Sequence, residues 1–399
     1  MKNYKKLLTE LKVGKTIAQV EFLLFSVFAI LPYLCLVFMK KFFNKEIVFC
    51  RITAQRIGEF IGGTELFLRR LKNEKYLYKN IISIGYFRGP ISNRQLLKMY
   101  KRAWFIIQNN VFCYMLDCTW LRKTRFHREL PFNSNEYYEF NYLEPVLSFT
   151  ADEEAKGKQL LAKIGINEND WFVCFHSRDR AYLGGTPNHN DYRDCDVNNY
   201  LKAAEYIVAK GGFAIRMGAI VDKPLPKNKH PRIIDYAKDY RSDFMDVYLS
   251  AKCRFFLGCT AGLHVLPLIF GVPVAGANFT HLEIPLIGEK DIFISKTIRD
   301  IKGNRVITFP EIFAKRIGKW LSSNDFEKAG IEVIENTPDE ILKLAQEMNE
   351  SIGGKIRYSE EDVALQKRYH ALIKPEHVCY GVPSKIGAHF LRDNEELLR

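Results

Sequence analysis

The residues with the clearest chemical potential follow a short apolar run, Trp171–His176, whose pattern predicts a buried strand. His176 closes the run and Arg178 stands two positions on, so in an extended strand end both side chains address one pocket. An arginine holds a diphosphate through a bidentate fork, and a histidine can donate a hydrogen bond beside it. Arg178 would stabilise the charge of a leaving diphosphate without a metal. In the alternative interpretation, Arg178 pairs with Asp179 or Asp194 in a structural network.

A strand–helix–strand unit must position this pair. A polar loop and a helix follow the first strand, and a second apolar run, Phe213–Met217, ends at Gly218. Ligands of open α/β sheets bind at the carboxyl ends of the strands. Arg216 and Gly218 are therefore further candidates for binding an anionic ligand.

A second small-residue segment, Gly258–Gly262 (GCTAG), follows another apolar run. Small residues at a strand-to-helix turn let backbone N–H groups approach an anion, and Thr260 adds a hydroxyl donor next to Ala261 and Gly262. In the alternative interpretation these residues only allow close packing of helix and strand. His264 is expected to be a buried structural histidine rather than a ligand.

Two carboxylates are candidates for catalysis. Glu59 lies in the segment Arg56–Gly63 (RIGEFIGG), which predicts a glycine-bearing turn but lacks the GxGxxG spacing and the lysine of nucleotide-binding motifs. Glu59 would act there as a general base, and the alternative is a solvated side chain. Asp179, next to Arg178, is the second candidate.

No metal site is expected in the loop after the first strand. His176, His189, Asp191 and Asp194 fit no helical metal-binding spacing, and the neighbouring arginines would repel a cation. Asp194 also begins a DxD triplet, but its second aspartate, Asp196, is better explained as a helix N-cap.

The whole chain has the character of a folded α/β protein. Its 399 residues allow two domains, and a hydrophobic content of 47% with 13% aromatic residues excludes a disordered chain. Alternating strands and helices predict parallel, Rossmann-like sheets. We expect a membrane-associated segment at residues 1–45, Rossmann-like domains at 46–150 and 151–350, and a helical tail at 351–399.

The expected elements follow from apolar runs and capping residues. Thr150 and Glu153 form a capping-box signature at the entry to the second domain. An aromatic-rich loop is expected at Glu136–Glu144. The predicted strands are Glu46–Ile52, Ile81–Tyr86, Trp171–His176, Phe213–Met217, Arg254–Leu257, Val272–Ala275 and Ile292–Ser295, and the predicted helices are Ala151–Ile164, Val197–Lys210, Ser242–Lys252 and Ser359–Leu372.

The N-terminal segment combines an apolar run with basic flanks. Phe22–Met39 is uncharged over 18 residues, near the 20 or so that a spanning helix needs. Lysines such as Lys12 and Lys15 give residues 1–45 a net charge of +6, which favours an anionic membrane surface over a solvated tail. Pro32 would kink a helix, so we expect a bent, monotopic helix pair, the alternative being a buried core helix.

Charge and cysteine usage restrict partners and compartment. The net charge of +13 is concentrated beside the apolar run rather than along an aromatic stripe, so no nucleic-acid partner is expected. Nine scattered cysteines without a CxxC pair indicate a reducing compartment.

Taken together, several ordered motifs resemble a bacterial family of glycosyltransferases that is similar to the O-fucosyltransferase-like branch of the two-domain GT-B fold. The resemblance covers residues 46–399. Its motifs are RIG (Arg56–Gly58), FVCFHSRD (Phe172–Asp179), YRD (Tyr192–Asp194), IRMG (Ile215–Gly218), FFLGCTAGL (Phe255–Leu263), GVPV (Gly271–Val274), ENTPDEI (Glu335–Ile341) and GAHFLRDNEELL (Gly387–Leu398).

The resemblance implies a nucleotide-sugar donor on the second domain and a glycan or lipid-linked acceptor facing the first. Transfer would be metal-independent and inverting, with no cofactor, at the cytoplasmic face of the inner membrane in a peripheral or monotopic protein. Catalytic roles would fall to Arg178, Glu59 and Asp179, although the family often has histidine where this chain has Glu59. The implied donor-binding residues are His176, Arg178, Arg216, Gly218, Thr260, Ala261 and Gly262.

In a second hypothesis the chain has the same pocket but catalyses no reaction. In this interpretation the chain is a non-catalytic, membrane-associated protein that binds a nucleotide sugar or another phosphate-bearing ligand as a sensor or scaffold. Such a protein needs neither a general base nor an acceptor site.

Overall fold

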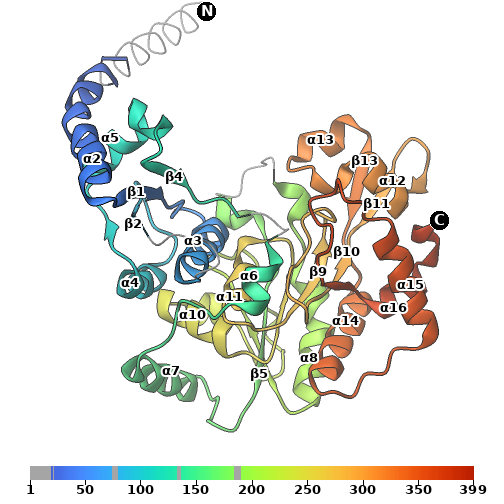
Figure 1. The fold of residues 1–399 in the computed structure, drawn as a ribbon. Helices are drawn as coiled ribbons and strands as arrows, with labels where there is room; N and C mark the ends of the chain where they lie inside the picture. Colours follow the sequence, from blue (N-terminus) through green and yellow to red (C-terminus); the bar gives the residue numbers. More distant parts are fainter. Residues whose placement is uncertain (1–18, 21, 74–79, 133–135, 184–189) are drawn as a thin grey trace, which may run out of the picture. The chain divides into compact units, whose positions relative to one another are not determined.

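The structure is a computed structural model that describes residues 19–20, 22–73, 80–132, 136–183 and 190–399 (Figure 1). The chain forms two compact units: unit 1 comprises Met1–Asn93 and Leu97–Pro131, and unit 2 comprises Arg94–Leu96 and Phe132–Arg399. This division differs from the expected domains. The boundary lies at Pro131 rather than residue 150, the N-terminal segment belongs to unit 1, and the segment after residue 350 belongs to unit 2.

Unit 1 is built on a parallel sheet, as the alternating pattern predicted. Its described strands lie in the order β3-β2-β1-β4, and all paired neighbours are parallel. The first two strands confirm predicted ones, whereas β3 and β4 are too short to show a pattern. The elements are β1 (Glu46–Arg51), α3 (Ile57–Lys72), β2 (Ile81–Tyr86), α4 (Arg94–Ala103), β3 (Ile106–Ile107), α5 (Asn110–Cys118), η2 (Trp120–Lys123) and β4 (His127–Glu129).

The predicted glycine turn at Arg56–Gly63 is wrong, because this segment starts α3. The helix begins after Arg56, which adopts an extended N-cap conformation, and Phe60 is fully buried in its first turns. A Cβ on Gly63 would lie 2.1 Å from the carbonyl oxygen of Leu130, just beyond β4. The glycine therefore permits close contact between the helix and the chain rather than a change of direction.

Unit 2 contains a larger sheet whose paired strands are again all parallel. Its described strands lie in the order β14-β10-β9-β8-β5-β6-β7. Sequence order reverses between β5 and β8, which makes this pair the switch point of a doubly wound sheet. The strands are β5 (Phe172–Phe175), β6 (Phe213–Arg216), β7 (Ile233–Ile234), β8 (Phe256–Gly258), β9 (Val274–Phe279), β10 (Ile292–Ser295) and β14 (Lys385–Ile386). The α/β class with two parallel sheets is thus confirmed.

The predicted helices of unit 2 form, and a side chain caps the N-terminus of each. Thr150 and Glu153 make the capping box of α7, and Asp196, Ser242 and Ser359 each accept a hydrogen bond from a backbone N–H of the helix that they open. The helices of this part are α7 (Ala151–Lys163), η5 (Val197–Tyr200), α8 (Leu201–Ala209), α9 (Tyr236–Asp239), α10 (Asp243–Lys252), η6 (Gly262–His264), α11 (Val265–Ile269) and α15 (Glu360–Ala371).

Three parts of unit 2 differ from expectation. The aromatic segment expected as a loop contains a helix, α6 (Tyr137–Tyr142), with Phe140 buried. A small antiparallel sheet, β12-β11-β13, was not predicted. The expected tail is part of the fold, because β14 joins the large sheet. The remaining elements are η3 (Arg180–Leu183), η4 (Asp191–Arg193), β11 (Thr297–Asp300), β12 (Arg305–Val306), α12 (Phe309–Ala314), η7 (Ile317–Lys319), α13 (Ser323–Lys328), β13 (Ile331–Ile334), α14 (Pro338–Ile352), α16 (Ala388–Asp393) and η8 (Glu395–Leu398).

The apolar N-terminal segment forms a long helix (Figure 1), and one side of it packs on the rest of unit 1. Among the described residues, Phe22–Phe43 is the one helix long and apolar enough to cross a membrane, and α2 (Ile30–Phe43) is its second part. Ala29 is fully buried against unit 1, where the Tyr33 and Trp120 rings lie 4.9 Å apart. Most of the helix is exposed, so it is not a buried core helix. The exposed apolar residues include Phe22, Leu23, Leu24, Val27, Phe28, Leu31, Leu34 and Phe38. Lys12 and Lys15 lie outside the described residues.

Candidate functional site

The two sequence segments predicted to bind an anion meet at the switch point of unit 2. The backbone N–H of His176 donates to the carbonyl of Leu257 over 2.9 Å, and the N–H of Arg178 donates to Cys259 Sγ over 3.2 Å. The chain after β5 therefore runs beside the chain after β8. Because both strands end at this edge, the arrangement is where open α/β sheets bind ligands.

Arg178 is held in an ion pair, as the alternative interpretation proposed. Its Nη1 contacts Asp194 Oδ1 and donates to the carbonyl of Asn190 over 3.1 Å, and the side chain is 8% exposed. Burial, with Arg193 nearby, lowers the pKa of Arg178. Its second terminal nitrogen, Nη2, is buried and has no hydrogen-bond partner among the described residues. One terminal nitrogen of the Arg178 guanidinium is thus paired with Asp194, and the other can still bind a ligand.

Ser177 adds a second polar group to this edge. The residue is 3% exposed, and its hydroxyl oxygen has no hydrogen-bond partner among the described residues. Buried polar groups are nearly always paired, so two adjacent residues with unpaired buried atoms need an explanation. Because Ser177 and Arg178 lie at the switch point, a polar ligand is the simplest one.

A lysine that the sequence analysis missed supports the turn carrying Asp194. Lys296 follows β10, is 3% exposed, and its Nζ donates to the carbonyls of Tyr192 and Asp194 over 3.1 and 2.6 Å. Burial lowers the pKa of its ammonium group. Lys296 follows a predicted strand, so the rule that selected Arg178 would also have found it.

Three histidines around this edge are held neutral. Burial lowers the pKa of His176 and His264 to about 4 and that of His281 to about 3. The Nδ1 of His176 lies 3.0 Å from the carbonyl oxygen of Met217, and the Nε2 of His281 lies 2.6 Å from the Tyr192 hydroxyl. At neutral pH these side chains carry no positive charge. His176 and His281 make hydrogen bonds, whereas His264 Nδ1 has no partner among the described residues.

Arg216, Asp179 and Gly218 have structural roles that the sequence did not reveal. Arg216 is 1% exposed and donates through Nη1 to the Lys223 carbonyl over 2.6 Å, with Asp235 at 3.3 Å. Both carboxylate oxygens of Asp179 accept backbone N–H groups. A Cβ on Gly218 would lie 2.8 Å from a Val221 methyl, so Gly218 allows close packing. A role of these three residues in ligand binding or catalysis stays a prediction, and Arg216 Nη2, like that of Arg178, has no hydrogen-bond partner among the described residues.

The GCTAG segment contributes through its backbone rather than through Thr260. The Thr260 hydroxyl donates to the Asn278 carbonyl over 3.4 Å and accepts the Thr280 N–H, so it joins two strand ends. Ala261 is extended, and the helical turn begins at the exposed Gly262. The first N–H groups of a helix lack partners within it, so Gly262 stays a candidate for contacting an anion.

Glu59 has the surroundings of a solvated side chain. It lies in the first turn of α3 in unit 1, and its carboxylate is 52% exposed and 3.4 Å from Arg56 Nη1. This matches the alternative stated from the sequence, and a role as general base stays a prediction. The described residues contain no metal-binding group of histidine, cysteine, aspartate or glutamate, but His189 lies outside them, so the absence of a metal also stays a prediction.

The chain resembles solved glycosyltransferase structures with which it shares little sequence. No family model and no curated protein matches the sequence. A glycosyl transferase family 9 structure from Veillonella parvula is 9% identical with a TM-score of 0.42, over 76% of this chain and 96% of that one. The E. coli ADP-heptose lipopolysaccharide heptosyltransferase II is 12% identical with a TM-score of 0.42, over 62% of this chain and 90% of that one. These likenesses are too weak to carry a functional argument.

Proposed function

We propose that the chain is a membrane-associated glycosyltransferase that binds the diphosphate of a nucleotide sugar at the switch point of unit 2. The observation that carries the proposal is the pair of unpartnered buried groups at that edge, Arg178 Nη2 and the Ser177 hydroxyl. A phosphate group carries several acceptor oxygens for donors at this edge, and an arginine bond to phosphate is among the strongest hydrogen bonds in proteins. The choice of sugar transfer over other nucleotide chemistry depends on the motif resemblance.

The ion pair gives Arg178 a defined orientation for this role. Asp194 and the Asn190 carbonyl fix Nη1, so the Arg178 side chain is already ordered before a ligand binds. Little further conformational entropy is lost when Nη2 binds the ligand. As the bond between the sugar and the diphosphate breaks, negative charge grows on the leaving group. A preorganised cation stabilises that charge without a metal, and an acceptor hydroxyl attacks the anomeric carbon with inversion.

Membrane association is the second part of the proposal. Phe25 and Tyr33 pack on unit 1, at 5.1 Å from Tyr114 and 4.9 Å from Trp120, while the opposite side of the same helix is apolar and exposed. A helix that crosses a bilayer alone is surrounded by lipid, whereas this helix has one side covered by protein. The arrangement supports a monotopic helix lying in the interface, here proposed at the cytoplasmic face of the inner membrane.

A direct test measures nucleoside diphosphate released from a panel of sugar nucleotides. Arg178→Ala alone breaks the pair with Asp194 and leaves only the exposed Arg180 near that carboxylate; breaking a buried pair in this way costs roughly 3 kcal/mol. The informative variant is therefore the double variant Arg178→Ala/Asp194→Ala, which removes both charges. Arg180→Ala is the matched control, because Arg180 is 58% exposed and 3.7 Å from the same Asp194.

We expect wild type and Arg180→Ala to turn over one donor and the folded double variant to be about 100-fold slower, the usual loss for one charge-stabilising group. Equal rates in all three proteins would refute the assignment of Arg178.

A non-catalytic binding protein is the second candidate, favoured by one observation. Asp179 has both oxygens bonded to backbone, and Glu59 is exposed beside Arg56, so neither predicted catalytic carboxylate has the surroundings of a general base. Saturable binding of a sugar nucleotide without turnover, even with glycolipid extract added, would support this candidate over the transferase.

A further inference from the structure

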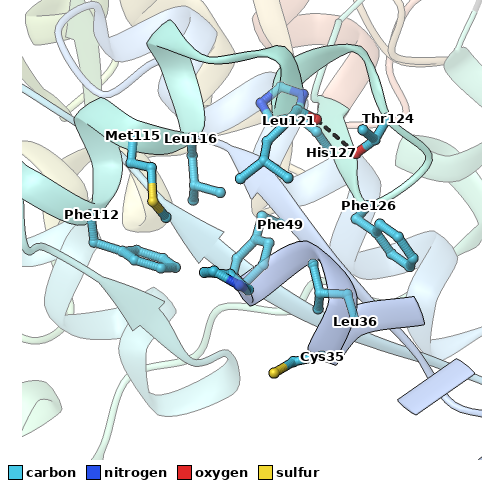
Figure 2. A pocket seen from close by; sticks show the side chains of 11 residues that line it. Cys35, Leu36, Phe49, Phe112, Met115, Leu116, Leu121, Thr124, Phe126 and His127 are labelled. Carbon is cyan, nitrogen blue, oxygen red and sulfur yellow. Dashed lines mark hydrogen bonds between the residues drawn. The ribbon is translucent and has the colours of Figure 1, made fainter. Parts of the chain in front are cut away.

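A cavity of about 200 Å³ lies in unit 1 beneath α2 (Figure 2). Its walls come from several elements: Leu36 lies on α2, Phe49 on β1, Met115 on α5 and Leu121 on η2. Figure 2 shows these side chains gathered around one space. The lining is almost entirely apolar, so the cavity differs in kind from the polar edge of unit 2.

The polar groups at this cavity are already satisfied by the protein. The Thr124 hydroxyl donates to the Leu121 carbonyl over 2.7 Å, and His127 Nε2 lies 2.6 Å from the Tyr86 hydroxyl. Burial also lowers the pKa of His127, so its ring is uncharged at neutral pH. A bound water needs two to four polar partners, and an apolar cavity of this size instead takes hydrocarbon.

The cavity reaches the surface on the apolar helix. Cys35 lines the cavity and is itself exposed, so its position marks the mouth. Its neighbour Leu34 is 56% exposed and Leu31 is 70% exposed. The mouth therefore lies within the surface that we propose to enter the membrane.

Cations lie along the segment that forms one wall. Between the lining residues Leu121 and Phe126, the side chains of Arg122, Lys123 and Arg125 are exposed. Glu46, which pairs with Arg125 at 2.8 Å and with Lys40 at 3.0 Å, has its pKa lowered to about 2, chiefly by Arg125. Arg122 likewise pairs with Glu129 at 2.8 Å, but three cations against these two carboxylates leave the segment with a net positive charge. Positive charge next to an apolar cavity matches an anionic lipid headgroup.

We propose that this cavity binds one acyl chain of an anionic phospholipid, with its headgroup near Arg122, Lys123 and Arg125. The inference rests on the proposed membrane association of the N-terminal helix and is independent of sugar transfer. A cavity of 150 Å³ holds a benzene-sized group of six carbons, so this one holds a chain segment of roughly eight. Each CH₂ buried there contributes about fourfold in affinity.

The test uses vesicles that contain a phosphatidylglycerol with a diazirine group on one acyl chain. Cys35→Trp places a large side chain at the mouth without entering the core, and Leu34→Trp is the matched control on the exposed side of the same helix. After irradiation, mass spectrometry locates the crosslinks. Flotation of each variant with the vesicles is measured separately.

We expect wild type and Leu34→Trp to crosslink within 112–127, and Cys35→Trp to lose at least tenfold of this signal while still floating. Crosslinks confined to the helix 22–43 in a floating wild type would overturn the cavity assignment. Equal labelling by a neutral phosphatidylcholine probe would overturn the headgroup assignment. If a small fraction of polyprenyl phosphate abolished the crosslinking signal, the ligand would be a polyprenyl lipid carrier, and the assignment to a phospholipid would be overturned.

Failure of the protein to float at all would instead remove the membrane association on which the inference rests. Donor turnover by unit 2 in Cys35→Trp reports on the transferase proposal separately.

Discussion

At the residue scale, the central feature is the guanidinium of Arg178, which the protein contacts through Nη1 but not through Nη2. Arg178 and Asp194 are sixteen positions apart, and the course of the loop between them cannot be read from composition. The sequence therefore left open whether Arg178 pairs or binds a ligand, and the structure shows the pair with Nη2 still unpartnered. Arg216, which ends an apolar strand, was indistinguishable from Arg178 in the sequence, and in the structure it too combines a buried pair, with Asp235, and an Nη2 that has no hydrogen-bond partner among the described residues.

Neutral buried histidines make stability depend on pH, and His281 is the clearest case. Burial lowers its pKa from 6.5 to about 3, with Arg193 adding to the effect. Below pH 6.5 the unfolded chain gains a proton that the folded chain does not bind, so stability present above pH 6.5 is lost on acidification. Between pH 7 and pH 4, wild type should lose about 3 kcal/mol more unfolding free energy than His281→Gln. Urea titrations across this range measure the difference, and parallel profiles would contradict it.

At the element scale, strands with long apolar runs were predictable and short ones were not. The predicted bounds of β2 and β10 are those observed: β2 begins directly after Asn80, and β10 lies between Asp291 and Lys296. β3, β7 and β14 have two residues each, too few for any periodicity, and tertiary pairing alone defines them. The two anion-binding segments could be expected to meet because both follow predicted strands of one sheet.

The helix that replaced a predicted turn provides a test of packing. Gly63→Ala would improve helix propensity by about 1 kcal/mol, but its Cβ meets a backbone oxygen of Leu130 at 2.1 Å. We expect a net destabilisation of roughly 2 kcal/mol, typical of strain in a packed core. Chemical denaturation followed by circular dichroism measures it. Glu59→Ala in the exposed first turn of the same helix is the control, and a Gly63→Ala variant as stable as this control would show that the contact relaxes freely.

At the scale of the whole molecule, each unit repeats one topology. In both sheets the first strand lies in the interior, and the next two strands are added on one side of it. The fourth strand is added on the other side, so the strand order reverses at β1–β4 in unit 1 and at β5–β8 in unit 2. Only unit 2 has unpaired buried groups of an arginine and an adjacent serine at this point among the described residues. The two units therefore share architecture, and the chemistry of the reversal point supports the proposal that the diphosphate binds to unit 2.

The exposed helix gives the molecule a predicted membrane side. Phe28→Glu/Leu31→Glu places two charges on the exposed apolar surface, where these residues are 71% and 70% exposed. Charges oppose burial in lipid, so flotation with phosphatidylglycerol-containing vesicles should fall at least tenfold. Ile220→Glu, at a 57% exposed position of unit 2, is the control and should float like wild type. Equal flotation of all three proteins would contradict a membrane role for this surface.

The location of the diphosphate is tested most directly by hydrogen–deuterium exchange with and without a saturating nucleoside diphosphate. The account predicts slower amide exchange in two segments, 176–181 after β5 and 259–264 after β8, and little change near Glu59 in unit 1. Saturable binding that leaves both segments unchanged, or that protects only the carboxyl end of β1, would contradict a diphosphate site at the switch point of unit 2.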